Sequence, residues 1–140
     1  MGVEIFHLNL VSPIYVIPEE DPRPFQSPAL NDGGSGQEKI FCYELDEVQC
    51  LAFEPDQNKL FGRLIFGGVS VAAEGGAQIP KGNYLFAQRR EILNKDEIIA
   101  MAVEIQMEGL WQRLKPLNKL YLRYLFEDGS WVTQLYRPYS

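Results

Sequence analysis

Thiols and imidazoles are the side chains that most readily bind zinc or act as nucleophile or base near neutral pH, and this 140-residue sequence has three of them: Cys42, Cys50 and the single histidine, His7. They do not make a zinc site, which needs about four such ligands. His7 has no carboxylate or thiol next to it in the chain to orient it as a general base. We therefore predict no metal site and expect both cysteines to be buried free thiols.

Other motifs of catalysis and cofactor binding are missing from the sequence. Its glycines lack the G-x-G-x-x-G spacing of a dinucleotide site, and no serine lies in a G-x-S-x-G elbow. The carboxylates at 19–21 are expected to be solvated, because acid–base catalysis needs two carboxylates held in one cleft. Arg89 and Arg90 would point to opposite sides of an extended chain and could not hold one anion together. We predict no catalytic residue and no cofactor.

The composition excludes several classes of protein. With 46% hydrophobic and 23% charged residues, the chain fits one globular domain spanning 1–140. A net charge of -6 argues against nucleic acid as a partner, because binding to phosphates needs a basic surface. No apolar run approaches the roughly 18 residues that span a bilayer, and the start lacks a secretory signal pattern. We expect a cytoplasmic protein without a membrane partner.

One helix is predicted over 95–114. Asn94 and Glu97 have the spacing of a capping box at its start, and Pro116 follows its end. The helix carries a broad apolar arc, which should face a sheet.

The last stretch, 119–138, has the pattern of a β-hairpin. Asp128-Gly129 favours a two-residue type I′ turn, which would pair Phe126 with Trp131. One face is then apolar and should pack on the helix, with Leu120, Leu122, Tyr124, Phe126, Trp131, Thr133 and Leu135. The opposite face is mixed, as in a lined cavity or a second layer, with Tyr121, Arg123, Leu125, Val132, Gln134 and Tyr136.

Further strands are predicted on both sides of a proline-rich stretch. Residues 3–17 should form a strand that is broken or bent at Pro13. The segments rich in β-branched and aromatic residues are 39–45, 48–54, 60–74 and 83–88. Gly67-Gly68 indicates a bulge or a close backbone approach. The prediction is an α+β fold with an antiparallel sheet of about six to seven strands, covered on one face by the helix. The stretch 18–37 is predicted as a long loop within this domain.

Residues 83–137 read strand, helix, strand, strand, and the chain enters them through Pro80, Gly82 and Tyr84. This order resembles the second half of the GyrI-like small-molecule-binding domain. The resemblance implies two such units with a cleft between them for apolar or cationic ligands, and a cleft position for Tyr84. The family's cleft carboxylate has no counterpart, because Glu127 lies beside the hairpin turn, and the place of the first unit's helix is taken by the 18–37 loop.

Aromatic residues are the best candidates for a binding site in a chain with 8 Phe, 7 Tyr and 2 Trp. The leading hypothesis is a non-catalytic binding module for an apolar or aromatic small ligand. Its cleft would be lined by Tyr84, Phe86, Trp111, Tyr121 and Tyr136. The alternative is that these aromatic residues only pack the core, with Tyr84 and Phe86 in a core strand and Trp111 and Trp131 between helix and sheet.

Two other functions stay open. The acidic, proline-rich loop 18–37 could adopt an extended conformation and dock a protein partner. A small hydrolase is consistent with the GyrI-like resemblance, since some proteins of that family are enzymes, and Tyr84 and Glu127 would then be the residues to substitute.

Overall fold

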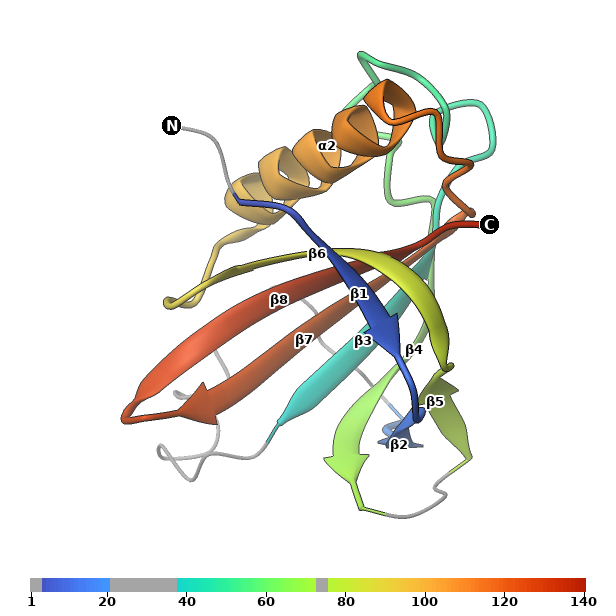
Figure 1. Ribbon diagram of the computed structural model, residues 1–140. Helices are drawn as coiled ribbons and strands as arrows, with labels where there is room; N and C mark the ends of the chain where they lie inside the picture. The colour runs from blue at the N-terminus through green and yellow to red at the C-terminus, as the bar shows by residue number, and fades with distance from the viewer. Residues whose placement is uncertain (1–3, 21–37, 73–75) are drawn as a thin grey trace.

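The computed structural model describes residues 4–20, 38–72 and 76–140. These residues form one helix, α2 (Lys95–Trp111), and eight strands (Figure 1). The strands are β1 (Phe6–Leu10), β2 (Ile14–Pro18), β3 (Lys39–Glu44), β4 (Arg63–Val71), β5 (Ala77–Ile79), β6 (Gly82–Arg89), β7 (Lys119–Glu127) and β8 (Ser130–Pro138).

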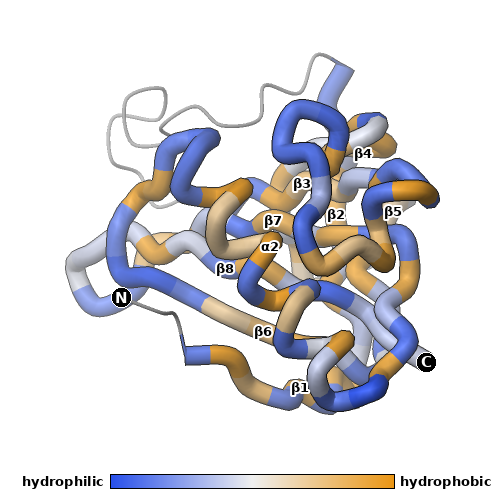
Figure 2. The backbone as a smooth tube through the Cα atoms, turned by 90° about the horizontal axis from the view of Figure 1, so that it is seen from above, coloured by the Kyte–Doolittle hydropathy of each residue, from blue (hydrophilic) through white to orange (hydrophobic). Residues whose placement is uncertain are grey.

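All eight strands belong to one antiparallel sheet, in the order β1-β6-β8-β7-β3-β4-β2-β5. The sheet is strongly curled (Figure 1). Side chains from both of its ends join one cluster on the inner face of the curl. Helix α2 covers the other face and, seen from above, lies across the middle of the sheet (Figure 2).

The α+β prediction with one helix on the sheet is confirmed, but the count of six to seven strands is wrong, because eight are present. The N-terminal stretch divides at Pro13 into two strands that join distant parts of the sheet, where β1 pairs with β6 and β2 with β4. Residues 77–79, which lie between the predicted strands at 60–74 and 83–88, form β5 by pairing with β2. Both differences come from pairing between segments far apart in the chain.

The predicted strand at 48–54 is also wrong, because this segment forms turns. The Asp46 carboxylate accepts hydrogen bonds from the backbone N–H groups of Val48 at 2.9 Å and Gln49 at 3.3 Å. The N–H of Cys50 donates to the Asp46 carbonyl at 2.8 Å. A side chain that satisfies nearby backbone groups in this way offers the chain an alternative to a sheet ladder.

The start of α2 follows its capping chemistry. Asn94 Oδ1 accepts the N–H of Glu97 at 2.9 Å, and Glu97 Oε1 accepts the N–H of Asn94 at 3.1 Å, so the predicted capping box is confirmed. Ile98, Ala102 and Ile105 are buried against the sheet, as the apolar arc predicts.

The end of α2 lies at Trp111, three residues before the predicted boundary at 114. Arg113 adopts a left-handed conformation with φ 61°. The N–H of Leu114 then donates to the Gly109 carbonyl at 2.9 Å, which closes the last turn. This closure usually has glycine at the left-handed position. Because arginine takes that position here, the sequence contains no glycine that would mark the end of the helix.

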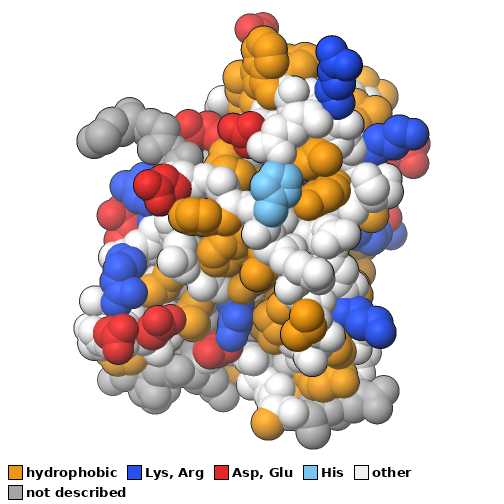
Figure 3. Space-filling view, in the orientation of Figure 1, with side chains coloured by type: hydrophobic (Ala, Val, Ile, Leu, Met, Phe, Trp, Pro, Cys, Tyr) orange, Lys and Arg blue, Asp and Glu red, His pale blue; other side chains and the backbone are white. Residues whose placement is uncertain are grey.

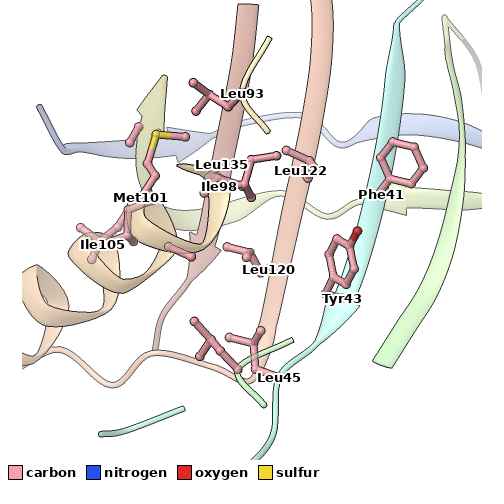
Figure 4. Close-up of a cluster of buried hydrophobic side chains, with 14 of the residues drawn as sticks. Phe41, Tyr43, Leu45, Leu93, Ile98, Met101, Ile105, Leu120, Leu122 and Leu135 are labelled. Atoms are coloured by element: carbon pink, nitrogen blue, oxygen red, sulfur yellow. The ribbon is translucent and has the colours of Figure 1, made fainter. Parts of the chain in front are cut away.

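The C-terminal hairpin has the predicted turn and register. Asp128 and Gly129 both have positive φ, and Phe126 pairs with Trp131 across the ladder. The apolar face of the hairpin packs under α2 in what we call the helix-side core (Figure 4). This core includes Leu120, Leu122, Tyr124, Trp131 and Leu135 from the hairpin and Ile98, Met101 and Ile105 from α2.

Gly68 marks a close approach of two backbones. A Cβ atom at this position would overlap the carbonyl of Ile17 on the neighbouring strand β2. The register of β3 against β4 also shifts between Cys42 and Tyr43, which places an irregularity close by. The close approach that the Gly67-Gly68 pair predicts is therefore confirmed at Gly68.

Candidate ligand-binding site

Four of the five predicted site residues meet on the inner face of the sheet. The ring centroid of Tyr84 lies 6.2 Å from that of Tyr121 and 6.1 Å from that of Tyr136, and the Phe86 and Tyr136 centroids are 5.1 Å apart. All three contacts are edge-to-face, the geometry that aromatic pairs favour. We call these four residues the aromatic cluster.

The strand register explains why these rings converge. Tyr136 of β8 pairs with Phe86 on one side and with Tyr121 on the other. Tyr84 lies two residues before Phe86 and therefore points to the same face. The opposed Tyr121 and Tyr136 that the hairpin register predicts are thus confirmed as neighbours, and β6 brings the other two rings beside them.

Most of the aromatic cluster is closed to solvent. Tyr84, Tyr121 and Tyr136 are buried, whereas Phe86 is half-buried. The Tyr84 hydroxyl donates to the carbonyl of Pro80 at 2.5 Å, which ties the ring to the turn before β6. Burial, together with the nearby Cys42 and Tyr136, raises the pKa of Tyr84 to about 12, so its hydroxyl stays protonated at neutral pH.

The inner core surrounds the aromatic cluster with apolar side chains. It combines residues from the five strands β1 to β5: Val16, Ile40, Cys42 and Ile79, with Leu8, Leu10, Ile14, Phe66 and Ala77 packed against them. The free thiol of Cys42 is buried here, and Cys50 is buried in the helix-side core, as predicted for both.

A row of polar side chains continues from the aromatic cluster along the same face. The Tyr136 hydroxyl donates to Gln134 Oε1 at 2.6 Å and accepts from Arg123 Nη1 at 3.1 Å. Arg123 also forms an ion pair with Glu38 at 2.7 Å, and Gln134 Nε2 donates to Gln88 Oε1 at 2.9 Å. We call Glu38, Arg123, Gln134 and Gln88 the polar row.

Burial keeps the Tyr136 hydroxyl neutral, and the polar row orients it. Burial raises the pKa of Tyr136, while the charge of Arg123 acts in the opposite direction. The hydroxyl can therefore donate and accept at the same time. Arg123 and Gln134 follow from the predicted mixed face of the hairpin, but Glu38 and Gln88 carry no local signal that joins them to it.

Trp111 lies apart from the aromatic cluster. It is 74% exposed at the end of α2, and its ring contacts Phe53 at 6.1 Å between centroids. It belongs neither to the inner face nor to the helix-side core. The prediction that Trp111 packs between helix and sheet is therefore wrong. Trp131, at 9% exposure in the helix-side core, confirms that interpretation for the second tryptophan.

The residues considered for catalysis do not assemble into a reactive site. Tyr84 and Glu127 pair with opposite ends of β8, at Pro138 and Ser130. At about 3.3 Å per residue they are roughly 26 Å apart. Burial raises the pKa of the Cys42 thiol to about 11, which leaves it protonated and unreactive at neutral pH.

His7 and the arginine pair have structural partners. His7 Nδ1 lies 2.9 Å from the Tyr139 hydroxyl and Nε2 lies 2.6 Å from Gln112 Oε1, so the ring joins β1 to the end of α2. Arg89 pairs with Glu91, and Arg90 donates to the Glu127 carbonyl. In the described part of the chain, no three His, Cys, Asp or Glu side chains gather as metal ligands.

Comparison with known proteins adds no family: the chain matches no protein-family model, and no curated protein is detectably similar to it.

Across residues 4–20, 38–72 and 76–140, no helix combines the length and hydropathy of a membrane span. The predicted docking loop 18–37 falls almost entirely outside the described residues, which include only its first three positions.

Proposed function

We propose that this protein is a non-catalytic binding module that holds a small aromatic or apolar ligand on the inner face of its curled sheet. The observation that carries the proposal is the position of Phe86. It is the half-buried member of the aromatic cluster, and its ring is 5.1 Å from that of Tyr136. A flat ligand would stack on Phe86 without displacing the buried rings of Tyr84 and Tyr121.

The polar row supplies directional contacts beside this apolar surface. Small-molecule sites are typically apolar with a few placed polar groups. Gln88 is exposed at one end of the row, and Arg123 brings a charge that is already paired with Glu38. A ligand with one hydrogen-bonding group would therefore exchange a contact with Gln88 rather than break the ion pair.

The GyrI-like resemblance supports the same class of ligand. The strand-helix-strand-strand order behind that resemblance is present as β6, α2, β7 and β8. The implied cleft residue, Tyr84, lies in the aromatic cluster.

Thermal unfolding against a panel of aromatic, cationic and apolar small molecules tests the proposal. A ligand at 100 times its dissociation constant adds about 2.7 kcal/mol of stability, which raises the midpoint by several degrees in a domain of this size. We expect a shift for aromatic members of the panel. A panel that produces no shift would contradict the proposal.

A matched pair of substitutions locates the site. Phe86→Leu removes the ring on the inner face, and Phe126→Leu removes a part-exposed ring from the opposite face, where it contacts Trp131 at 5.4 Å. Ligand affinity should fall at least about tenfold in F86L, because buried aromatic contacts dominate binding, and stay unchanged in F126L. Equal effects of the two substitutions would remove the inner face from the binding site.

A further inference from the structure

Helix α2 presents apolar side chains to the solvent as well as to the core. Val103, Met107 and Trp111 follow one another at intervals of four residues, which places them on a single stripe. Val103 is partly exposed and also packs against the helix-side core, Met107 is partly exposed, and Trp111 is 74% exposed. A surface helix normally carries polar residues on this side, and a helix that is apolar all round is normally covered.

The turn segment beside α2 extends this apolar surface. Phe53 is 49% exposed and contacts the Trp111 ring, and Leu51 and Val48 are 57% and 81% exposed. We call Val48, Leu51, Phe53, Val103, Met107 and Trp111 the outer patch. Figure 3 shows apolar side chains gathered at the top of the molecule, over the end of α2, with both acidic and basic side chains at their border.

The outer patch is held in place by buried hydrogen bonds. Gln106 Nε2, on α2, donates to the carbonyls of Gln49, at 2.9 Å, and Ala52. Arg137 Nη2, on β8, donates to the Cys50 carbonyl at 3.1 Å. The exposed side chains of the turn segment are therefore carried by a backbone that is fixed to both the helix and the sheet, which lowers the cost of ordering on binding.

Carboxylates border the outer patch. Glu47 and Glu54 are exposed next to Val48 and Phe53 in the chain, and Glu104 and Glu108 lie one turn apart on α2 beside the apolar stripe. Arg113, just beyond the end of the helix, is the exposed cation nearest in sequence to Trp111. Lys115 is exposed two residues further on, so four carboxylates stand against two cations and the surface keeps a net negative charge that attracts cations.

We infer that the outer patch docks a partner protein through an amphipathic helix with basic flanking residues. Such a helix would lay its apolar side chains on Met107, Phe53 and Trp111 and its lysines or arginines over the carboxylates. A second copy of this chain is a poor occupant, because a two-fold contact would bring the same carboxylates together. A bilayer surface is disfavoured as well, since anionic lipids repel an acidic patch.

A synthetic helix provides the test. The probe is a peptide of about 18 residues, or five turns, made of leucine on one face and lysine on the other. Binding is followed by tryptophan emission, because Trp111 is exposed and Trp131 is not. We expect a blue shift with the leucine–lysine peptide and none with a peptide in which glutamate replaces lysine.

Substitutions in the full chain identify the surface. W111A should lower the affinity for the leucine–lysine peptide at least about tenfold, as for a central aromatic contact, and calorimetry measures this affinity. The pair E54K and E104K should reverse the preference toward the leucine–glutamate peptide. Glu127→Lys, an exposed charge reversal at the far hairpin, is the matched control and should leave both affinities unchanged.

Other outcomes would overturn the inference. Binding of both peptides with equal affinity, binding of neither, or an equal effect of E127K would each contradict a basic helical partner. Sedimentation as a dimer that W111A dissociates would assign the patch to a second copy. A blue shift with phosphatidylglycerol vesicles and not with the peptide would assign it to a membrane surface.

Discussion

Cys42 lies at the centre of the inner core, beside two tyrosines of the aromatic cluster. Desolvation by burial is the largest cause of its raised pKa, which moves from an ordinary value of 9.0 to about 11. In the same surroundings Tyr84 titrates only near pH 12. The chemistry of this core is therefore that of neutral groups, which suits an apolar or aromatic ligand.

We expect the free energy of unfolding to fall between about pH 9 and pH 11. Above pH 9 the unfolded chain releases the Cys42 proton while the folded chain retains it, so the stability that is complete below pH 9 is lost as the pH approaches 11. The part of the loss that comes from Cys42 should be on the order of 2 kcal/mol, from about 1.4 kcal/mol per pKa unit.

Urea unfolding of the wild type and Cys42→Ala at pH 8 and pH 10 measures this loss. Cys42→Ala lowers stability at both values through the cavity it leaves, but it should flatten the dependence between them. Five buried tyrosines, Tyr43, Tyr84, Tyr121, Tyr124 and Tyr136, also have pKa values raised above the ordinary 10.0, so they add a loss of stability toward pH 10 that both proteins share. An equally steep pH dependence in both proteins would show that Cys42 is not its source.

At the scale of elements, the end of α2 is the least expected feature of the chain. An arginine at a left-handed position costs roughly 1 kcal/mol relative to glycine, and here the closing hydrogen bond from Leu114 to Gly109 requires that conformation. The early end of the helix leaves Trp111 in the last turn, where it points to solvent and completes the outer patch.

Arg113→Gly should stabilise the domain. Glycine adopts the left-handed conformation without strain, and after its own entropy cost we expect a gain of about 0.5–1 kcal/mol in the free energy of unfolding. Arg113→Ala is the control, because alanine keeps the Cβ atom and should give no such gain. Thermal unfolding of the three proteins compares them, and a glycine variant no more stable than the alanine variant would refute the argument.

At the scale of the whole molecule, the side chain of Arg137 connects three separate segments of the chain. Arg137 of β8 is 2% exposed, and each of its three nitrogens donates to a different segment. Nε reaches the Leu117 carbonyl at 2.7 Å, Nη1 reaches Gln106 of α2 at 3.0 Å, and Nη2 reaches the Cys50 carbonyl at 3.1 Å. Burial lowers the pKa of Arg137 to about 10, which still leaves the side chain charged at neutral pH.

Arg137→Lys should destabilise the protein by about 2–4 kcal/mol. The ammonium group cannot reproduce the planar fork, so buried acceptors lose their donors. Arg63→Lys, at an exposed pair with Glu44 at 3.1 Å, should change stability by less than about 0.5 kcal/mol. Chemical denaturation measures both, and similar small effects would mean that the Arg137 contacts are replaceable.

Arg137→Lys should also affect the outer patch. Loss of the bond to the Cys50 carbonyl releases one attachment of the turn segment that carries Leu51 and Phe53. Hydrogen exchange in residues 48–53 should therefore speed up in R137K more than exchange in the C-terminal hairpin.

Some elements were determined by the sequence alone, because their causes lie within a few residues. The Asp128-Gly129 pair selects a turn, and that turn sets the register of β7 and β8 down to the facing Tyr121 and Tyr136. Asn94 and Glu97 begin α2 by reciprocal hydrogen bonds. Part of the aromatic cluster could be predicted. The hairpin register places Tyr121 opposite Tyr136, and strand alternation places Tyr84 and Phe86 on one face.

The remaining features were decided only by the tertiary structure, because they depend on partners distant in the chain. Residues 77–79 become a strand by pairing with β2, and 48–54 forms turns that Gln106 and Arg137 hold. The ion pair of Arg123 with Glu38 joins positions 85 residues apart. No local pattern encodes such a contact, since it exists only once β3 and β7 have paired as neighbours in the sheet.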